Sequence, residues 1–323
     1  MTPEDAAPRP LAELIRGRKL RVSPLVWTSH HLELVGCRFE DDDAGEEAEH
    51  AGSNQNTTQR RENDGALSDE EWVEPCTVQH LAQCGAYRSK VCCISNLLWE
   101  DKVLVKACDH PKFFFAGRSV HRPKCTLFYD DIQPGRDVGQ VPPRVLGYFV
   151  YSDAVWRTQQ VTHARRHGVA VALLKEIPRK CKEWPRYPYI LCLLLCIAQF
   201  RVRVLKSPKT TAHTSRLLVS HVSDIEFIHL FEAEVTSELL QMLDKPDLAT
   251  GLTAWPTIKH QKIPFKPYED FKERLMAKIL TPSPFQHHEG TETRDETTTV
   301  LEHVGKRRRE QEGAERHNMR RKV

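Results

Sequence analysis

One uninterrupted apolar run constrains the fold more than any other feature of the sequence. Every residue from Tyr189 to Ala198 (YILCLLLCIA) is apolar, within a helix that we predict over Trp184 to Phe200. A helix that is apolar all round either lies inside a folded domain or crosses a membrane. The uncharged stretch from Tyr187 to Phe200 has 14 residues, whereas a bilayer core needs about 20. We therefore predict a helix in the core of a domain, with Leu194 buried at its middle, and no membrane association.

The cysteines and the N-terminal sequence indicate the compartment. The chain of 323 residues has ten cysteines without a repeating spacing, and it begins with MTPEDAAPRP, which lacks the apolar core of a signal peptide. Disulfides are rare in reducing compartments, so these patterns predict an intracellular protein with free thiols. The net charge of +3 is too small to indicate nucleic-acid binding by itself.

Charge and composition divide the chain into four parts. Seven of the ten residues from Glu40 to Glu49 are acidic and none is basic, and the polar composition continues for about twenty residues more. So little apolar surface cannot offset the entropy of ordering. The predicted parts are therefore a weakly ordered N-terminal part of the domain (1–39), an acidic disordered insertion or linker (40–71), the globular domain (72–280) and a disordered basic tail (281–323).

Hydrophobic periodicity predicts an α/β or α+β domain built on a mixed sheet. A strand over Arg144–Tyr151, a helix over Asp153–His167 and a strand over Val169–Leu174 form a predicted βαβ unit, whose two strands run parallel. After the apolar helix, two alternating segments predict a β-hairpin with its turn at Ser223–Asp224. An amphipathic helix over Tyr268–Leu280 ends the predicted domain.

The sequence lacks the common cofactor and catalytic motifs. It contains no G-x-G-x-x-G, no G-x-x-x-x-G-K-[ST] and no G-x-S-x-G, which argues against kinases, Rossmann and P-loop proteins and α/β-hydrolases. Cys76, His80 and Cys84 would align on one helical face, but a structural zinc site needs four ligands and no second close pair is in place. His229 lies on an apolar strand face, which favours a hydrogen-bonded core histidine. We therefore predict no metal and no cofactor.

Two basic clusters near the C-terminus resemble a bipartite nuclear-localisation signal. They consist of Lys306, Arg307, Arg308 and Arg309, and of Arg320, Arg321 and Lys322. Such clusters bind a nuclear import receptor or nucleic acid, so we expect a nuclear rather than a cytoplasmic location. Because three glutamates lie between the clusters, a tail that only increases solubility is the alternative interpretation.

The order of elements in the middle of the chain resembles the αβββαβ core of the PD-(D/E)XK nuclease-like superfamily. The matching segments are a helix that ends at Trp99, strands over Lys112–Ala116, Cys125–Tyr129 and Arg144–Tyr151, and the helix and second strand of the βαβ unit. In such a core an acidic residue ends the second strand, a (D/E)-x-K motif lies on the third, and together they hold a divalent metal. The resemblance places Asp130 or Asp131 at the first acid. The third strand has Tyr148-Phe149-Val150 where Glu-x-Lys is expected, so the resemblance implies an inactive member.

These observations favour a non-catalytic binding or regulatory protein of the nucleus. The alternative is a metal-dependent nuclease that uses Mg²⁺ or Mn²⁺, in which Glu100 or Lys175 supplies what is missing beside Asp130 and Asp131. Convergence of these side chains in one cleft would favour the nuclease. The segments EWPRYPYILCLLL and KIPFKPYEDF are also similar to those of uncharacterised proteins of filamentous fungi, a resemblance that implies no activity.

Overall fold

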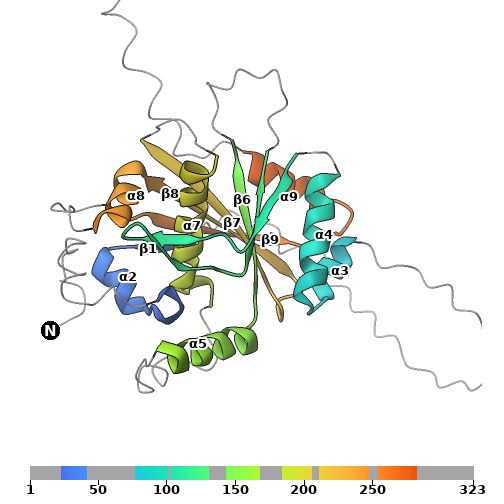
Figure 1. The fold of residues 1–323 in the computed structure, drawn as a ribbon. Coiled ribbons are helices and arrows are strands. Elements are labelled where there is room, and N and C mark those ends of the chain that lie inside the picture. Colours follow the sequence, from blue (N-terminus) through green and yellow to red (C-terminus); the bar gives the residue numbers. More distant parts are fainter. Residues whose placement is uncertain are drawn as a thin grey trace, which may run out of the picture. The chain divides into compact units, whose positions relative to one another are not determined.

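A mixed seven-stranded sheet forms the centre of the structure, a computed structural model that describes residues 23–41, 77–100, 103–130, 143–167, 184–205, 211–246 and 254–281. All these residues belong to the unit Met1–Thr281. In sheet order the strands are β1 (Arg38–Asp41), β9 (Thr257–Pro264), β8 (Phe227–Thr236), β7 (Ala212–His221), β6 (Val145–Tyr151), β5 (Cys125–Tyr129) and β2 (Val105–Asp109) (Figure 1). The pairs β1–β9 and β6–β7 are parallel, and the other pairs of this sheet are antiparallel. The predicted α/β class and mixed sheet are confirmed.

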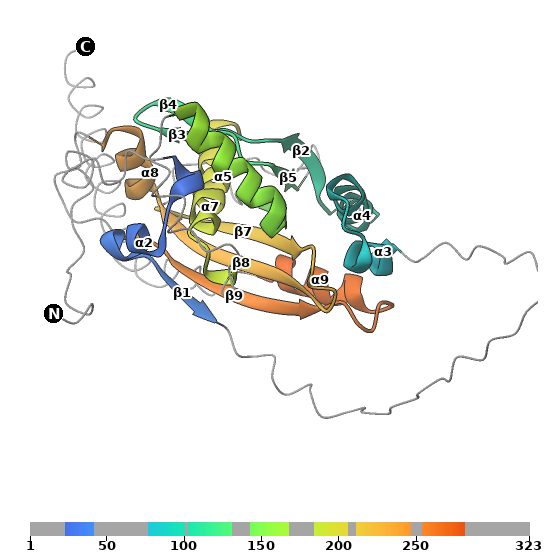
Figure 2. The same cartoon turned by 90° about the horizontal axis from the view of Figure 1, so that it is seen from below.

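Helices cover both faces of the sheet. One face packs against α7 (Tyr189–Arg203), together with α2 (Ser29–Val35), α5 (Asp153–His167), α8 (Ser237–Asp244) and the short helices η2 (Pro24–Val26) and η4 (Trp184–Arg186) (Figure 2). The opposite face packs against α3 (Thr77–Gln83), α4 (Tyr87–Trp99) and α9 (Phe271–Leu280). Alternation along β7 serves both cores, because Leu217 and Val219 belong to the first and Leu218 to the second.

The helix α7 is buried along almost its whole length, which confirms the prediction from the apolar run. Every residue from Tyr189 to Gln199 is buried, and Leu194 has no exposed surface. The helix packs against β6, β7 and β8 on one side. On its other sides it contacts η2, α8 and a separate ribbon of two strands, β3 (Phe113–Phe115) and β4 (Arg118–His121). Because these elements enclose it, α7 needs no polar face.

A glycine in β6 allows α7 to approach the sheet closely. A Cβ atom at Gly147 would lie 2.6 Å from Cδ1 of Ile197 and 3.0 Å from Cδ1 of Leu217. Both distances are shorter than the optimal separation of carbon atoms, about 3.5–4.0 Å. The backbone at Gly147 is outside the left-handed region, so this position requires glycine for space and not for conformational freedom.

The strands next to β5 and β6 differ from the predicted order. The segment expected as a strand over 112–116 forms β3, which pairs with β4 and not with the main sheet. The side-chain amide of Gln199 explains this position, because it accepts from the backbone N–H of Phe114 and donates to the carbonyl of Phe114, both at 2.8 Å. The strand beside β5 is therefore β2. The predicted strand over Val169–Leu174 lies outside the described residues, and the parallel neighbour of β6 is β7.

The predicted C-terminal hairpin and amphipathic helix are confirmed, and two further strands extend the sheet beyond them. β7 and β8 form the hairpin, and Thr236 caps α8 by accepting a hydrogen bond from the N–H of Leu239 at 3.1 Å. β9 is not evident in the sequence TIKHQKIP, which has few apolar residues. Glu40 and Asp41 begin the segment expected to be disordered, but they end β1 because they pair with β9.

The helical region expected over Val78–Trp99 consists of two helices, α3 and α4. Nζ of Lys90 is fully buried and donates to the carbonyls of Leu81 and Ala82 at the end of α3. Burial lowers the pKa of Lys90. The helix α3 ends at Gln83, so Cys84 lies beyond it. Cys76, the third member of the sequence pattern with His80 and Cys84, lies outside the described residues.

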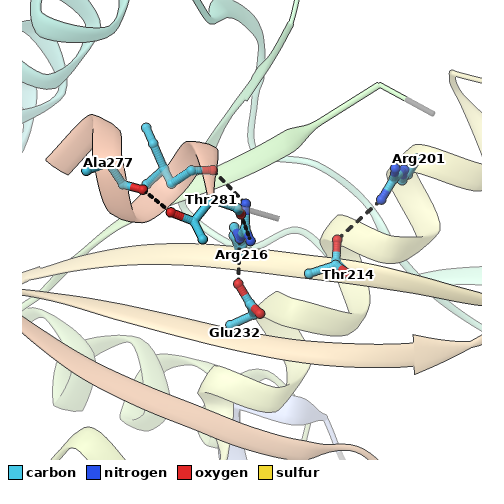
Figure 3. Close-up of polar contacts among 7 residues, drawn as sticks. Arg201, Thr214, Arg216, Glu232, Ala277 and Thr281 are labelled. Carbon is cyan, nitrogen blue, oxygen red and sulfur yellow. Dashed lines mark hydrogen bonds and ion pairs between the residues drawn. The ribbon is translucent and has the colours of Figure 1, made fainter. Parts of the chain in front are cut away.

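A partly buried arginine joins the hairpin to α9 on the face opposite α7. Nε of Arg216 in β7 donates to Oε2 of Glu232 in β8 at 2.5 Å. Its two terminal nitrogens donate to the carbonyls of Ile279 and Thr281 at 2.6 Å each (Figure 3). The last carbonyls of a helix lack partners within the helix, so this guanidinium caps α9 and fastens it to the sheet. We call Arg216 and its three acceptors the arginine node.

Candidate functional site

A cleft of about 620 Å³ lies where β6 ends and α5 begins. The parallel strands β6 and β7 both end here, with Tyr151 paired to His221, and β5 starts here with Cys125 paired to Phe149. The first residues of α4 form the opposite wall. Ligands of α/β proteins commonly bind beyond the carboxyl ends of parallel strands. The cleft is therefore the best-placed candidate site in the described part of the chain.

The polar side of the cleft is positively charged. Arg88 from the first turn of α4, Lys124 from the residues before β5, and His110 line it. Neither aspartate nor glutamate is among the described residues that line the cleft. The first turns of α4 and α5 also contribute to the walls, and helix N-termini carry partial positive charge. An anionic group fits this side of the cleft best.

The nearby carboxylates already have partners. Asp109 forms an ion pair with Lys106 at 2.7 Å and accepts a hydrogen bond from Thr126 at 2.7 Å. Burial raises the pKa of Asp109, but these hydrogen bonds outweigh burial and the net shift is downward. Asp153 accepts a hydrogen bond from the hydroxyl of Tyr151 at 3.1 Å. Of the three basic residues of the cleft, His110 interacts electrostatically with Asp109, whereas among the described residues no ion pair joins Arg88 or Lys124 to these two acids.

The other side of the cleft is apolar and firmly held. It includes Phe149, Val155, Trp156 and Val222. The indole N–H of Trp156 donates to the hydroxyl of Tyr187 at 2.6 Å, and its ring packs on Tyr189 of α7 with the centroids 4.3 Å apart. Anchoring in the core keeps this wall in place, so an apolar or planar part of a ligand has a preformed surface to contact.

The residues expected for a nuclease do not converge in the described part of the chain. Asp130 follows β5, and its Oδ1 accepts a hydrogen bond from the backbone N–H of Arg144 at 2.7 Å. Burial raises the pKa of Asp130. Glu100 follows α4 and pairs with Lys272 of α9 at 2.9 Å. Asp131 and Lys175 lie outside the described residues, as do the seven basic residues of the predicted nuclear-localisation signal.

The register of β5 and β6 places Asp130 far from Tyr148, which occupies the position of the expected (D/E)-x-K motif. Tyr148 pairs with Thr126, whereas Asp130 lies four positions further along β5, beside Arg144. That separation is about 13 Å along a strand. Tyr148 is fully buried and donates from its hydroxyl to Oγ of Ser220 at 2.9 Å. Among the described residues, no group of three His, Cys, Asp or Glu side chains could hold a metal ion.

The cleft residues are not evident from the sequence. Arg88, Lys124 and His110 are single polar residues in three different segments, and none belongs to a motif. Only the pairing of β5 with β6, and the position of α4 beside them, brings them together. A search of the sequence for basic clusters finds the C-terminal tail instead.

Comparison of the chain with known protein families, with curated protein sequences and with solved structures finds no match. None of the helices in the part of the chain that the structure describes is both long enough and apolar enough to span a bilayer.

Proposed function

We propose that this is a non-catalytic binding protein that takes a phosphate-bearing ligand in the cleft between α4 and α5. The observation that supports this function is the pairing of a positively charged wall, free of carboxylates among its described residues, with a fixed apolar wall. Phosphates would contact Arg88 and Lys124, and a base or another planar group would contact the wall at Phe149 and Trp156. A nucleic-acid strand is the ligand that we propose.

A degenerate nuclease-like core is part of this proposal. If the intervening β3, β4, α5 and η4 are left out, α4, β2, β5, β6, α7 and β7 give a helix, three strands, a helix and a strand, with α7 and β7 in the places expected for the helix over 153–167 and the strand over 169–174. The four strands are neighbours in the sheet, and only β6 and β7 among them are parallel. This connectivity supports the αβββαβ resemblance, with β2 in place of the segment 112–116. Tyr148 in β6 can neither hold a metal nor activate water, which supports binding without cleavage.

Binding of a short fluorescent single-stranded oligonucleotide tests the proposal. The double variant Arg88→Glu/Lys124→Glu should lose at least about tenfold in affinity at constant ionic strength, because each cation lost removes a phosphate contact. The control Arg118→Glu/Lys245→Glu makes the same change of charge at exposed positions of β4 and at the end of α8. It should bind within about twofold of the wild type.

Two results would contradict this function. Equal losses in both double variants would show that net charge, and not the cleft, determines binding. Cleavage of the oligonucleotide with Mg²⁺ or Mn²⁺, abolished by Asp130→Ala, would replace the binding protein with the metal-dependent nuclease.

We also propose that the protein is nuclear, on the basis of the two basic clusters of its tail. Deletion of residues 306–323 should move a fluorescent fusion from the nucleus to the cytoplasm. Replacing Glu310, Glu312 and Glu315 by glutamine keeps both clusters, so that variant should remain nuclear. An unchanged distribution after the deletion would leave the tail with a solubilising role only.

A further inference from the structure

Two buried histidines with an aspartate at each end form one linear hydrogen-bonded chain on the α7 face of the sheet. Oδ1 of Asp41 in β1 lies 2.8 Å from Nδ1 of His260 in β9. Nε2 of His260 lies 2.9 Å from Nδ1 of His229 in β8. Nε2 of His229 lies 2.9 Å from Oδ2 of Asp224, in the turn between β7 and β8. We call these four residues the histidine chain.

The strand register and two aromatic rings isolate the middle of the histidine chain from solvent. His260 pairs with Phe231 and His229 with Lys262, so the two histidines are diagonal neighbours on one face. Their side chains are 5% and 3% exposed, whereas the carboxylates at the two ends are 43% and 23% exposed. Phe231 stacks on His260 with centroids 4.7 Å apart, and Trp184 contacts His229 edge-on at 4.4 Å. Water therefore cannot replace a hydrogen bond lost in the middle.

The number of hydrogen bonds fixes the number of protons. An ionised carboxylate only accepts, so the bond to Asp41 needs a proton on His260 and the bond to Asp224 needs one on His229. The bond between the two rings needs a third proton. Two neutral imidazoles carry only two N–H protons between them. The three bonds therefore require one imidazolium in the pair.

The carboxylates do not supply the third proton. Hydrogen bonds from His260 and Arg186 lower the pKa of Asp41. Burial raises the pKa of Asp224, but hydrogen bonds from His229 and from backbone N–H groups of the turn outweigh it, and the net shift is downward. Both acids are thus ionised at neutral pH. Burial lowers the pKa of His260 despite its hydrogen bond to Asp41, so the third proton is shared within the pair and is not supplied by either acid.

Charged groups from every neighbouring element face this chain. At the Asp41 end, Arg186 of η4 is paired with Asp41 at 2.8 Å, and Lys262 lies beside His260 in β9. At the Asp224 end, Lys90 of α4 interacts electrostatically with Asp224. His221 of β7 also lies at this end, 3.9 Å from Asp153 of α5. The two carboxylates that end the chain favour a positive charge between them, whereas Lys262 and burial oppose it.

We propose that the histidine chain is a proton-dependent tie between the edge strand β1 and the turn that joins β7 to β8. With three N–H protons all its bonds form. When the third proton leaves, one bond becomes a contact between two acceptors, at Asp41, between the rings or at Asp224, and the tie opens there.

Loss of the hydrogen bond at Asp224 would alter the turn that forms part of the cleft wall. Oδ1 of Asp224 accepts hydrogen bonds from the N–H groups of Glu226 and Phe227, at 3.0 and 2.9 Å, and so shapes the turn. Val222 of the same turn lines the cleft. This consequence for ligand binding rests on the proposed function, whereas the tie itself does not.

The sign of the pH dependence follows from the proton count. Above the ordinary histidine pKa of about 6.5, the two unfolded rings hold two N–H protons, and the folded pair holds three. Stability must then fall as pH rises, by about tenfold in the folding equilibrium constant per pH unit, until the folded pair loses its third proton. Below about 6.5 both unfolded rings are charged, so the folded pair holds fewer protons and stability falls with falling pH.

Urea unfolding of the full chain between about pH 7 and 8 tests the tie through the difference in slope between the wild type and a variant, because the other histidines and the cysteines contribute equally to both. The stability of the wild type should fall with rising pH more steeply than that of His229→Gln, by up to about tenfold in the folding equilibrium constant per pH unit. The control is His213→Gln, because burial and the neighbouring Arg201 lower the pKa of His213 to about 4, so that between about pH 7 and 8 this ring is neutral in the folded protein and almost neutral in the unfolded chain. This control should keep the slope of the wild type. Equal slopes for the wild type and His229→Gln would overturn the proposal.

A second measurement needs no variant and keeps the test decisive if His229→Gln does not fold. Long-range ¹H–¹⁵N spectra of the wild type report the protonation of each imidazole nitrogen. Three protonated nitrogens in His229 and His260 near about pH 7 would support the tie. Two would overturn it. Neither measurement involves an oligonucleotide, so failure of the tie and failure of the cleft as a binding site are distinguishable.

Discussion

The arginine node and the histidine chain lie back to back on β8 and hold the sheet by different chemistry. Glu232 of the node and Phe231, which stacks on His260, are consecutive residues that point to opposite faces. Arg216 donates to a carboxylate and two backbone carbonyls, and a guanidinium stays charged at every physiological pH. The histidine chain has its full set of bonds only with the right number of protons. The contacts on one face of β8 are thus independent of pH, whereas those on the other face depend on the protonation of two histidines.

The largest effect in this comparison should come from removal of the arginine. Arg216→Met removes the guanidinium from Glu232, whose side chain is only 13% exposed, and removes the cap of α9. Loss of one member of a buried ion pair typically costs about 3–5 kcal/mol. We expect that loss in urea unfolding, equal at about pH 6.5 and 8, because a guanidinium stays charged over this range.

Glu232→Gln is the matched control for the arginine node. It keeps an oxygen acceptor for Arg216 and removes only the charge, so its loss should be smaller than that of Arg216→Met. If Arg216→Met lowered the free energy of unfolding by less than about 1 kcal/mol, the arginine node would not be a major stabilising contact. If its effect changed between about pH 6.5 and 8, the node would not differ from the histidine chain in its dependence on pH.

A somewhat smaller effect should come from the apolar core beside both ties. Leu194→Ala at the middle of α7 should cost about 2–5 kcal/mol, because the enclosed site cannot collapse to fill the cavity. This loss should also be independent of pH, so it provides the reference slope against which the histidine variants are compared. Val202→Ala, at an exposed position of the same helix, should change the stability by less than about 0.5 kcal/mol. Similar losses in the two variants would contradict a buried α7.

Elements defined by local patterns could be predicted from the sequence. The apolar run over Tyr189–Ala198 identifies α7, and alternation identifies the hairpin of β7 and β8. The neighbours of each strand could not be predicted, because pairing depends on contacts between distant segments. The ribbon β3–β4 is an example, since one glutamine of α7 holds Phe114 away from the main sheet.

Neither the histidine chain nor the cleft could be predicted from the sequence, because each is formed by residues that are far apart in the chain. His229 is correctly identified as a hydrogen-bonded core histidine. Its partner His260 lies on β9, which has little apolar alternation, and Asp41 begins the segment predicted to be disordered. The bond between His260 and Asp41 joins residues 219 positions apart in the chain. Arg88 and Lys124 likewise meet only through the position of α4 beside the sheet.

Gly147 has a consequence for anyone who redesigns this domain. Consensus practice replaces a strand glycine by a β-branched residue to gain strand propensity. Here that exchange would place a Cβ atom 2.6 Å from Cδ1 of Ile197, so the gain in propensity would be lost to overpacking. A designer would first have to shorten Ile197 and Leu217 together. The close approach of α7 to β6 at this point thus depends on the missing side chain of Gly147 as well as on the sizes of Ile197 and Leu217.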